Sequence, residues 1–195
     1  MVTVAVVAMT KIFPSFAKWM KANVWLEIAA MVVGFVLLIF VACFKKLRRK
    51  VPLNYILLFS FTIVWSYMVA GFTNWFSVDK ILVSAGLTLA MFIGLTVYAG
   101  CAKEEQLAIL AGVAIVGCFA LFPMIFFCWY IRSYPIWWNF IYFAIILLIA
   151  LFILFDIRQI MTDLDTDEYI IGALILYVDT IMLFMQLLGA GGGGE

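Results

Sequence analysis

Long apolar runs dominate this chain, separated by short clusters of charged residues, prolines and asparagines. A helix that crosses a bilayer needs about 20 mainly apolar residues, and six runs reach that length. A seventh run, residues 1–16, is apolar without interruption only at its start, so we expect its helix to be short or truncated. The six longer runs are Val24–Phe44, Leu53–Phe76, Ile81–Ala102, Leu107–Ile131, Ile136–Ile157 and Tyr169–Leu188.

Apolar runs of this length predict helices, because every backbone polar group must be satisfied inside the hydrocarbon of the membrane. We therefore predict an all-α integral membrane protein that forms a single transmembrane domain over residues 1–195. Pro52 and Pro135 precede two of the runs, as expected at helix starts, where the missing N–H is harmless. Residues 189–195 are rich in glycine and are predicted to be a flexible tail.

Composition narrows the function classes. Of the 195 residues, 68% are hydrophobic and 12% are charged, which excludes a soluble domain. The absence of histidine removes the commonest general base and the commonest transition-metal ligand. The four cysteines lack metal-site spacing, and no phosphate-binding loop or Ser/His set is present, so we predict neither an enzyme nor a bound cofactor. The net charge of +1, without a basic stripe, argues against nucleic acid as a partner.

Positive charge is densest at residues 45–50, between the runs Val24–Phe44 and Leu53–Phe76. The positive-inside rule places this segment on the inner face of the membrane, where anionic lipid headgroups are its expected partner. Three lysines between residues 11 and 21 lie in the first loop, on the opposite face, so the charge asymmetry is modest.

Two aspartates lie inside the last two apolar runs: Asp156 near the end of one and Asp179 within the other. A carboxylate at membrane depth costs several kcal/mol unless it is paired, hydrated or protonated, so it marks a candidate functional site. On neighbouring helices the two carboxylates can share a proton or hold a hard cation such as calcium. They meet only if the helix predicted for Ile136–Ile157 continues past Ile157 towards Asp163. The alternative is an interhelical hydrogen bond with a purely structural role.

Several segments resemble the transmembrane Bax-inhibitor-motif (Lifeguard) family. Residues 52–62, PLNYILLFSFT, resemble the start of its third helix, and residues 87–99, LTLAMFIGLTVYA, resemble its fourth. The most specific likeness is FDIRQIM at 155–161 followed by DEYIIGALILYVD at 167–179. This pair is similar to the family's signature of an aspartate ending the sixth helix and a Tyr-x-Asp in the seventh. The likeness covers nearly the whole chain in matching order, apart from a missing soluble N-terminal tail and the glycine-rich end.

The resemblance implies a bundle of six helices around a central seventh, and a pH-sensitive calcium leak gated by Asp156 and Asp179. It also implies that a basic residue near the end of the second helix latches the first aspartate. Arg48 is the closest match by register, with Lys46 and Arg49 as alternatives. Family members act in calcium homeostasis and cell-death control, in the endoplasmic reticulum, Golgi or mitochondrial inner membrane. Bacterial members lie in the plasma membrane.

Two hypotheses of different classes follow. The first is a calcium leak channel, with protons as its second ligand, built on the aspartate pair. The second is a non-conducting structural subunit of a larger membrane assembly. The short first helix favours the second hypothesis slightly, because an open flank of the bundle would be covered by other membrane subunits or lipid.

Overall fold

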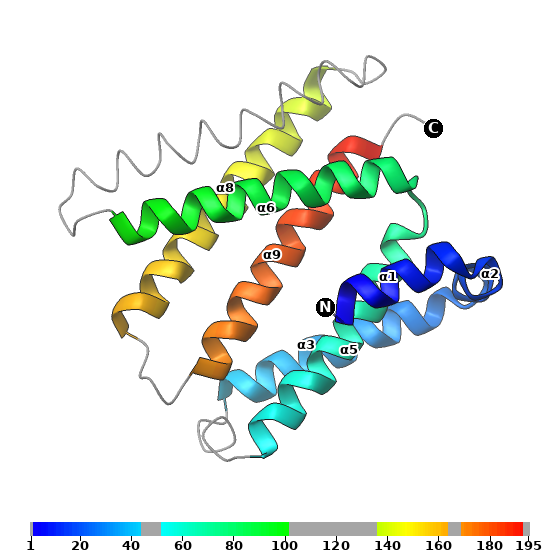
Figure 1. The fold of residues 1–195 in the computed structure, drawn as a ribbon, viewed down its shortest axis with the longest axis horizontal. Coiled ribbons are helices and arrows are strands. Elements are labelled where there is room, and N and C mark those ends of the chain that lie inside the picture. Colours follow the sequence, from blue (N-terminus) through cyan, green and yellow to red (C-terminus); the bar gives the residue numbers. More distant parts are fainter. Residues whose placement is uncertain (1, 44–51, 102–135, 164–168, 193–195) are drawn as a thin grey trace. The chain divides into compact units, whose positions relative to one another are not determined.

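The computed structural model describes residues 2–43, 52–101, 136–163 and 169–192, and these ranges are almost entirely helical (Figure 1). No strand occurs within them, which confirms the predicted all-α fold. The predicted run Leu107–Ile131 lies outside the described residues. The helices within the described ranges are α1 (Val2–Ile12), α2 (Pro14–Ala22), α3 (Val24–Cys43), α5 (Leu53–Thr73), α6 (Val78–Cys101), α8 (Ile136–Asp163) and α9 (Tyr169–Gly192).

Four of these helices, α5, α6, α8 and α9, are long and apolar enough to cross a membrane. Helix α3 has 20 residues, and its single charged side chain is Glu27. The predicted first run is two helices, because α1 and α2 meet at a bend of 99°. The chain is therefore an integral membrane protein, and its first helix is short, with 11 residues.

The bend has a local cause in the dipeptide Phe13-Pro14. A residue before proline is pushed away from the helical region of the backbone, and Phe13 is extended, with φ −110° and ψ 92°. Helix α1 therefore ends at Ile12. Pro14 then opens α2 at a position where its missing N–H costs nothing.

Two helices, α8 and α9, end later than the sequence predicted. Helix α8 continues six residues past Ile157 and ends at Asp163. Helix α9 includes the start of the predicted tail and ends at Gly192, so a flexible tail from residue 189 is wrong for residues 189–192. The physical reason is packing, because Ala190 is only 8% exposed and belongs to the apolar core with Leu187.

The helices group into two compact units. The first comprises Met1–Val78 with Asp165–Leu174, and the second comprises Asp79–Leu164 with Ile175–Glu195. Helix α9 therefore contributes its first residues to the first unit and the rest to the second. The single transmembrane domain and the arrangement of six helices around a central seventh remain predictions.

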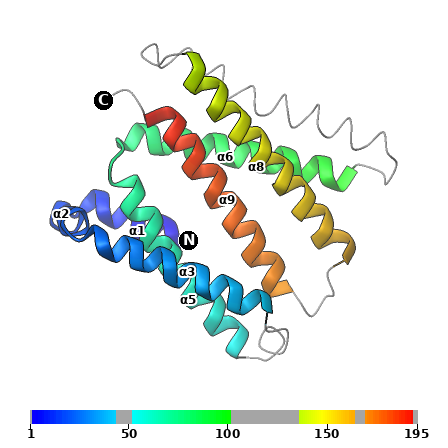
Figure 2. The same cartoon turned by 180° about the vertical axis from the view of Figure 1, so that it is seen from behind.

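In the first unit, α1 and α3 both lie against α5 (Figures 1 and 2). Glycine allows α3 and α5 to approach closely, as is common between membrane helices. Gly34 of α3 lies directly against the indole of Trp65, and Gly71 of α5 lies against the carboxyl group of Glu27. The earlier residue of α3 in these contacts, Glu27, meets the later residue of α5, Gly71, so the two helices are antiparallel.

In the second unit, α6, α8 and α9 share one apolar core. Each helix contributes buried residues at helical spacing, so one stripe of each faces the others. The buried members are Met91, Leu95 and Ala99 of α6, Ile146, Ala150, Ile153 and Ile157 of α8, and Leu183, Leu187 and Ala190 of α9.

Candidate ion and proton site

The extension of α8 decides where Asp156 lies. Because this helix continues to Asp163, Asp156 lies inside it with two helical turns to follow. Asp179 lies ten residues after Tyr169, about 15 Å along α9 at 1.5 Å per residue. Both aspartates are half-buried. The sequence predicted that the two aspartates meet only if the helix that carries Asp156 continues past Ile157 towards Asp163, and α8 does so.

The structure brings the two carboxyl groups into hydrogen-bonding contact. An ionised carboxylate only accepts hydrogen bonds, so such a contact requires one proton on the pair. One carboxyl oxygen of Asp179, Oδ2, is buried and has no hydrogen-bond partner among the described residues. The arrangement can therefore hold one proton between two side chains and still offers an unused carboxylate oxygen.

The surroundings of the pair are apolar. Asp179 precedes the buried Leu183 by one helical turn, so it continues the stripe of α9 that faces the core of the second unit. On α8, Ile153 and Ile157 of the same core lie three residues before Asp156 and one residue after it. These buried core side chains cannot compensate a second negative charge.

The pair alone does not form a resident metal site. Calcium takes six to eight oxygen ligands, whereas within the described ranges no three His, Cys, Asp or Glu side chains gather closely enough to hold an ion. Two carboxyl groups fit a cation that passes and is briefly bound, as a transported ion would be. Their role in binding ions or protons remains a prediction.

Arg158 is the described basic residue nearest to the pair in the sequence, two residues after Asp156. Arg48, the predicted latch, and its alternatives Lys46 and Arg49 lie outside the described residues. Arg158 is not among the predicted site residues, yet it is half-buried, and its Nη2 atom has no hydrogen-bond partner in the described part of the chain. No clear signal for it exists in the sequence, because Arg158 directly follows the predicted run Ile136–Ile157 and lies within a helix only because α8 continues to Asp163.

The start of α9 is held by a small polar cluster in the first unit. The hydroxyl groups of Tyr169 and Tyr55 lie 2.7 Å apart and are hydrogen-bonded. The side chain of Asn54, only 2% exposed, also forms a hydrogen bond with Tyr169. This cluster joins the first turn of the helix that carries Asp179 to the first turn of α5.

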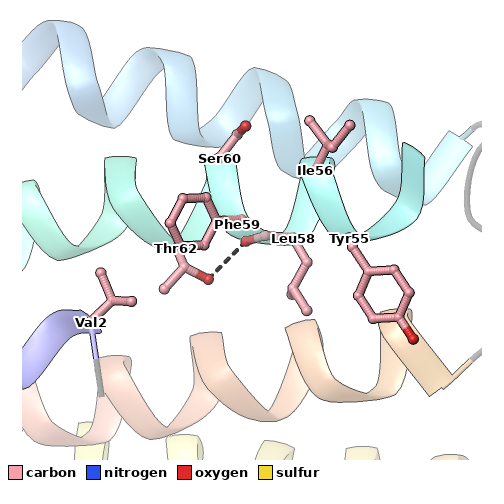
Figure 3. Close-up of a pocket in the computed structure, with 7 residues that line it drawn as sticks. All are labelled: Val2, Tyr55, Ile56, Leu58, Phe59, Ser60 and Thr62. Carbon is pink, nitrogen blue, oxygen red and sulfur yellow. Dashed lines mark hydrogen bonds between the residues drawn. The ribbon is translucent and has the colours of Figure 1, made fainter. Parts of the chain in front are cut away.

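A shallow groove of about 540 Å³ runs along α5 from Tyr55 to Thr62, with Val2 at one side (Figure 3). Its walls are mainly apolar, and none of its lining residues is charged. The Thr62 hydroxyl donates to the backbone oxygen of Leu58, within its own helix, at 2.8 Å. The groove therefore offers no ion-binding chemistry, and the aspartate pair is the better candidate site.

Comparison with known proteins gives a consistent family. Residues 1–192 match the family described as "Inhibitor of apoptosis-promoting Bax1". The chain is 34% identical over 146 residues to Protein lifeguard 4 of Mus musculus, covering 72% of this chain and 58% of that protein. It is 31% identical over 180 residues to Bax inhibitor 1 of Schizosaccharomyces pombe, covering 90% and 64%. None of these names describes an enzyme.

A more distant relative is Protein lifeguard 3 of Homo sapiens, 23% identical over 203 residues, with coverage of 97% of this chain and 64% of that protein. The chain spans about three fifths of the length of the curated relatives it matches. No solved structure matches the chain significantly.

Proposed function

We propose that this chain, which belongs to the family of inhibitors of apoptosis-promoting Bax1, is a pH-sensitive calcium leak gated by Asp156 and Asp179. The observation that supports this function is the contact between two half-buried carboxyl groups in an apolar core. A purely structural hydrogen bond does not require two acids, whereas two carboxyl groups in contact can share a proton and attract a cation.

The proposed mechanism uses one shared proton. Two negative charges at close range in a poorly solvated site repel each other, so the pair keeps a proton between its carboxyl groups. When the proton leaves, the pair carries two charges and attracts a cation more strongly. Arg48 is the proposed cation of the closed state, and calcium is the proposed cation of the open state, where carboxylate oxygens replace part of its hydration shell.

The names of the relatives suggest a cellular role for the proposed leak. One is called Bax inhibitor 1, and we propose that this chain also regulates cell death, from an organelle membrane such as the endoplasmic reticulum, Golgi or mitochondrial inner membrane. In a bacterium the plasma membrane takes that place. Expression in cells that produce Bax, with the wild-type chain compared with an Asp156→Asn/Asp179→Asn variant, tests the link: only the wild type should improve survival.

The direct test is calcium flux into liposomes. The purified chain is reconstituted into liposomes that contain a calcium indicator. Calcium entry into these liposomes is compared with entry into protein-free liposomes at pH 6 and pH 8. We expect flux above the empty liposomes and a difference between the two pH values. Folded, inserted protein without flux would contradict the proposal and favour the structural-subunit hypothesis.

A further inference from the structure

Helix α5 gives a ruler for depth in the membrane. Its 21 residues, Leu53–Thr73, are about 31 Å long at 1.5 Å per residue, which matches the thickness of the hydrocarbon core. The residues that follow Thr73 therefore mark one membrane surface. Trp75, which is 62% exposed, has the position expected of an interfacial aromatic side chain.

Helix α1 ends at this surface. Near its start, Thr3 accepts a hydrogen bond from Ser66, 3.1 Å away and seven residues before the end of α5. At its other end, the Lys11 ammonium donates to the backbone oxygens of Thr73, at 3.1 Å, and Phe76, at 2.6 Å. Helix α1 therefore runs parallel to α5 and rises to its C-terminal end.

Helix α3 begins at the same surface. Glu27, in its first turn, lies against Gly71, two residues before the end of α5. Gly34, two turns further along α3, lies against Trp65, deeper in the span. The chain thus arrives at this surface at the end of α1 and leaves it again at the start of α3.

Helix α2 connects these two points and must begin and end at one depth. Its nine residues, about 14 Å long, are too few to descend and return, and its axis is bent 99° away from α1. Two contacts hold it at the end of α5. The Asn74 amide donates to the backbone oxygen of Ala17 at 2.9 Å, and the Lys21 ammonium lies 4.6 Å from the centre of the Trp75 ring.

The side chains of α2 suit a bilayer surface. Met20 is fully buried against the protein, whereas Trp19 is 49% exposed and Lys18 is exposed beside it. The first acidic residue of the chain is Glu27, so no carboxylate near α2 in the sequence offsets its lysines. A short helix with exposed aromatic and basic side chains is typical of the interface, where lysine attracts anionic lipids.

We infer that α2 lies in the plane of the membrane surface and binds anionic lipid headgroups through Lys18 and Lys21. Lys11 is not part of this surface, because the backbone oxygens of Thr73 and Phe76 bind its ammonium group. The inference does not depend on calcium transport and applies to the protein whether or not it conducts.

The orientation is tested by the depth of single labels. Each residue from 14 to 22 is replaced in turn by a spin-labelled cysteine in full-length protein that lacks its native cysteines, reconstituted in liposomes. Depth is measured from the relative accessibility of each label to oxygen and to a water-soluble nickel chelate. We expect depth to oscillate with a period of about 3.6 residues around a constant value. A steady change of about 1.5 Å per residue would show a membrane-crossing helix and overturn the inference.

The lipid preference is tested with spin-labelled phosphatidylserine and phosphatidylcholine, by comparing the fraction of each that the protein immobilises. We expect wild type to prefer phosphatidylserine, and each of Lys18→Gln and Lys21→Gln to reduce that preference about five-fold. Lys80→Gln, at the start of α6, is the matched control and should leave it unchanged. If the double variant Lys18→Gln/Lys21→Gln keeps the full preference, the assignment of these two lysines is wrong.

Discussion

At the scale of single residues, environment separates carboxyl groups of the same type. Asp179 lies within α9, continues the apolar stripe of the second unit and has one buried oxygen without a partner among the described residues. Asp79 lies exposed in the first turn of α6, where the positive end of the helix and water stabilise its charge. The same substitution at the two positions therefore removes very different interactions.

Replacing Asp179 by asparagine tests the candidate site directly. The amide keeps the size of the side chain and is cheaper to bury than a carboxylate, so the fold should stay intact. The shared proton and the negative charge are both lost, so pH-dependent calcium flux should disappear. Asp79→Asn is the matched control and should conduct like wild type. If Asp179→Asn conducts normally with its pH dependence, the aspartate pair is not the gate.

A second residue-scale prediction concerns Gly34. An added Cβ would lie 2.8 Å from Nε1 of Trp65, whose indole is only 5% exposed and has little room to move. Overpacking of this kind costs about 1–3 kcal/mol. Gly34→Ala should therefore lower the thermal unfolding midpoint in detergent by about 2–10 °C.

The matched control for Gly34 is Gly86 of α6, where a Cβ would meet no atom within 4 Å. Alanine is the better helix former by about 0.5–1 kcal/mol, so Gly86→Ala should leave the midpoint unchanged or raise it slightly. Equal midpoints for Gly34→Ala and wild type would show that α3 and α5 approach less closely than described.

The residues of the candidate site were only partly predictable. A charged side chain in an apolar run is visible in the sequence, and this signal found Asp156 and Asp179. Their contact was not predictable, because it depends on where α8 ends. The partners of Lys11 were hidden for another reason: they are backbone oxygens more than 60 residues away, and backbone oxygens have no sequence signature.

At the scale of elements, Lys11 stabilises the end of α5 from a neighbouring helix. The last backbone oxygens of a helix lack partners within the helix and carry partial negative charge. The Lys11 ammonium binds two oxygens at this end, a role that a residue of α5 itself often takes. The contact therefore stabilises both the packing of α1 against α5 and the C-terminal end of α5.

Replacing Lys11 by methionine keeps the length of the side chain and removes its donors. We expect a loss of about 1 kcal/mol, which corresponds to a fall of about 2–4 °C in the unfolding midpoint. Lys18→Met, on the exposed face of α2, should leave the midpoint in detergent unchanged. A midpoint that falls equally in both variants would mean that the effect comes from net charge alone.

The positions of the helices could be predicted from the length of the apolar runs, but some helix ends and the bend between α1 and α2 could not. The predicted starts at Val24, Leu53, Ile136 and Tyr169 agree with the structure, because prolines or polar clusters precede them. The end of α8 was placed too early because the charged residue Arg158 was read as the limit of the apolar run that ends at Ile157. The residues of α2 were read as the end of a short run and a loop, since alternating lysines and aromatics do not form a long apolar segment.

At the scale of the whole molecule, the proposed gate gives a definite sign for the response to pH. A proton shared by Asp156 and Asp179 leaves one negative charge where there would be two, so the proposed latch Arg48 is held less strongly as pH falls. Leak should therefore rise from about pH 8 to about pH 6, the range in which such a pair titrates. Flux that is equal across this range would exclude the pair as a proton sensor.

The latch itself is tested by removing its charge. Arg48→Ala should raise the leak at pH 8 and flatten the pH response, because the closed state loses a contact that the open state lacks. Exchanging the charges of Arg48 and Asp156 should restore part of the closure. Lys46→Ala and Arg49→Ala, measured beside it, identify the latch as the residue whose loss raises the leak. If none does, residues 45–50 only set the orientation in the membrane.

The bend at Phe13 has a consequence for the membrane itself. A helix of nine residues that lies flat at one surface occupies area in one leaflet and none in the other. A helix inserted in one leaflet is accommodated with less lipid strain where that leaflet is stretched by curvature. The angle between two short helices would thus influence where in a curved membrane the protein accumulates.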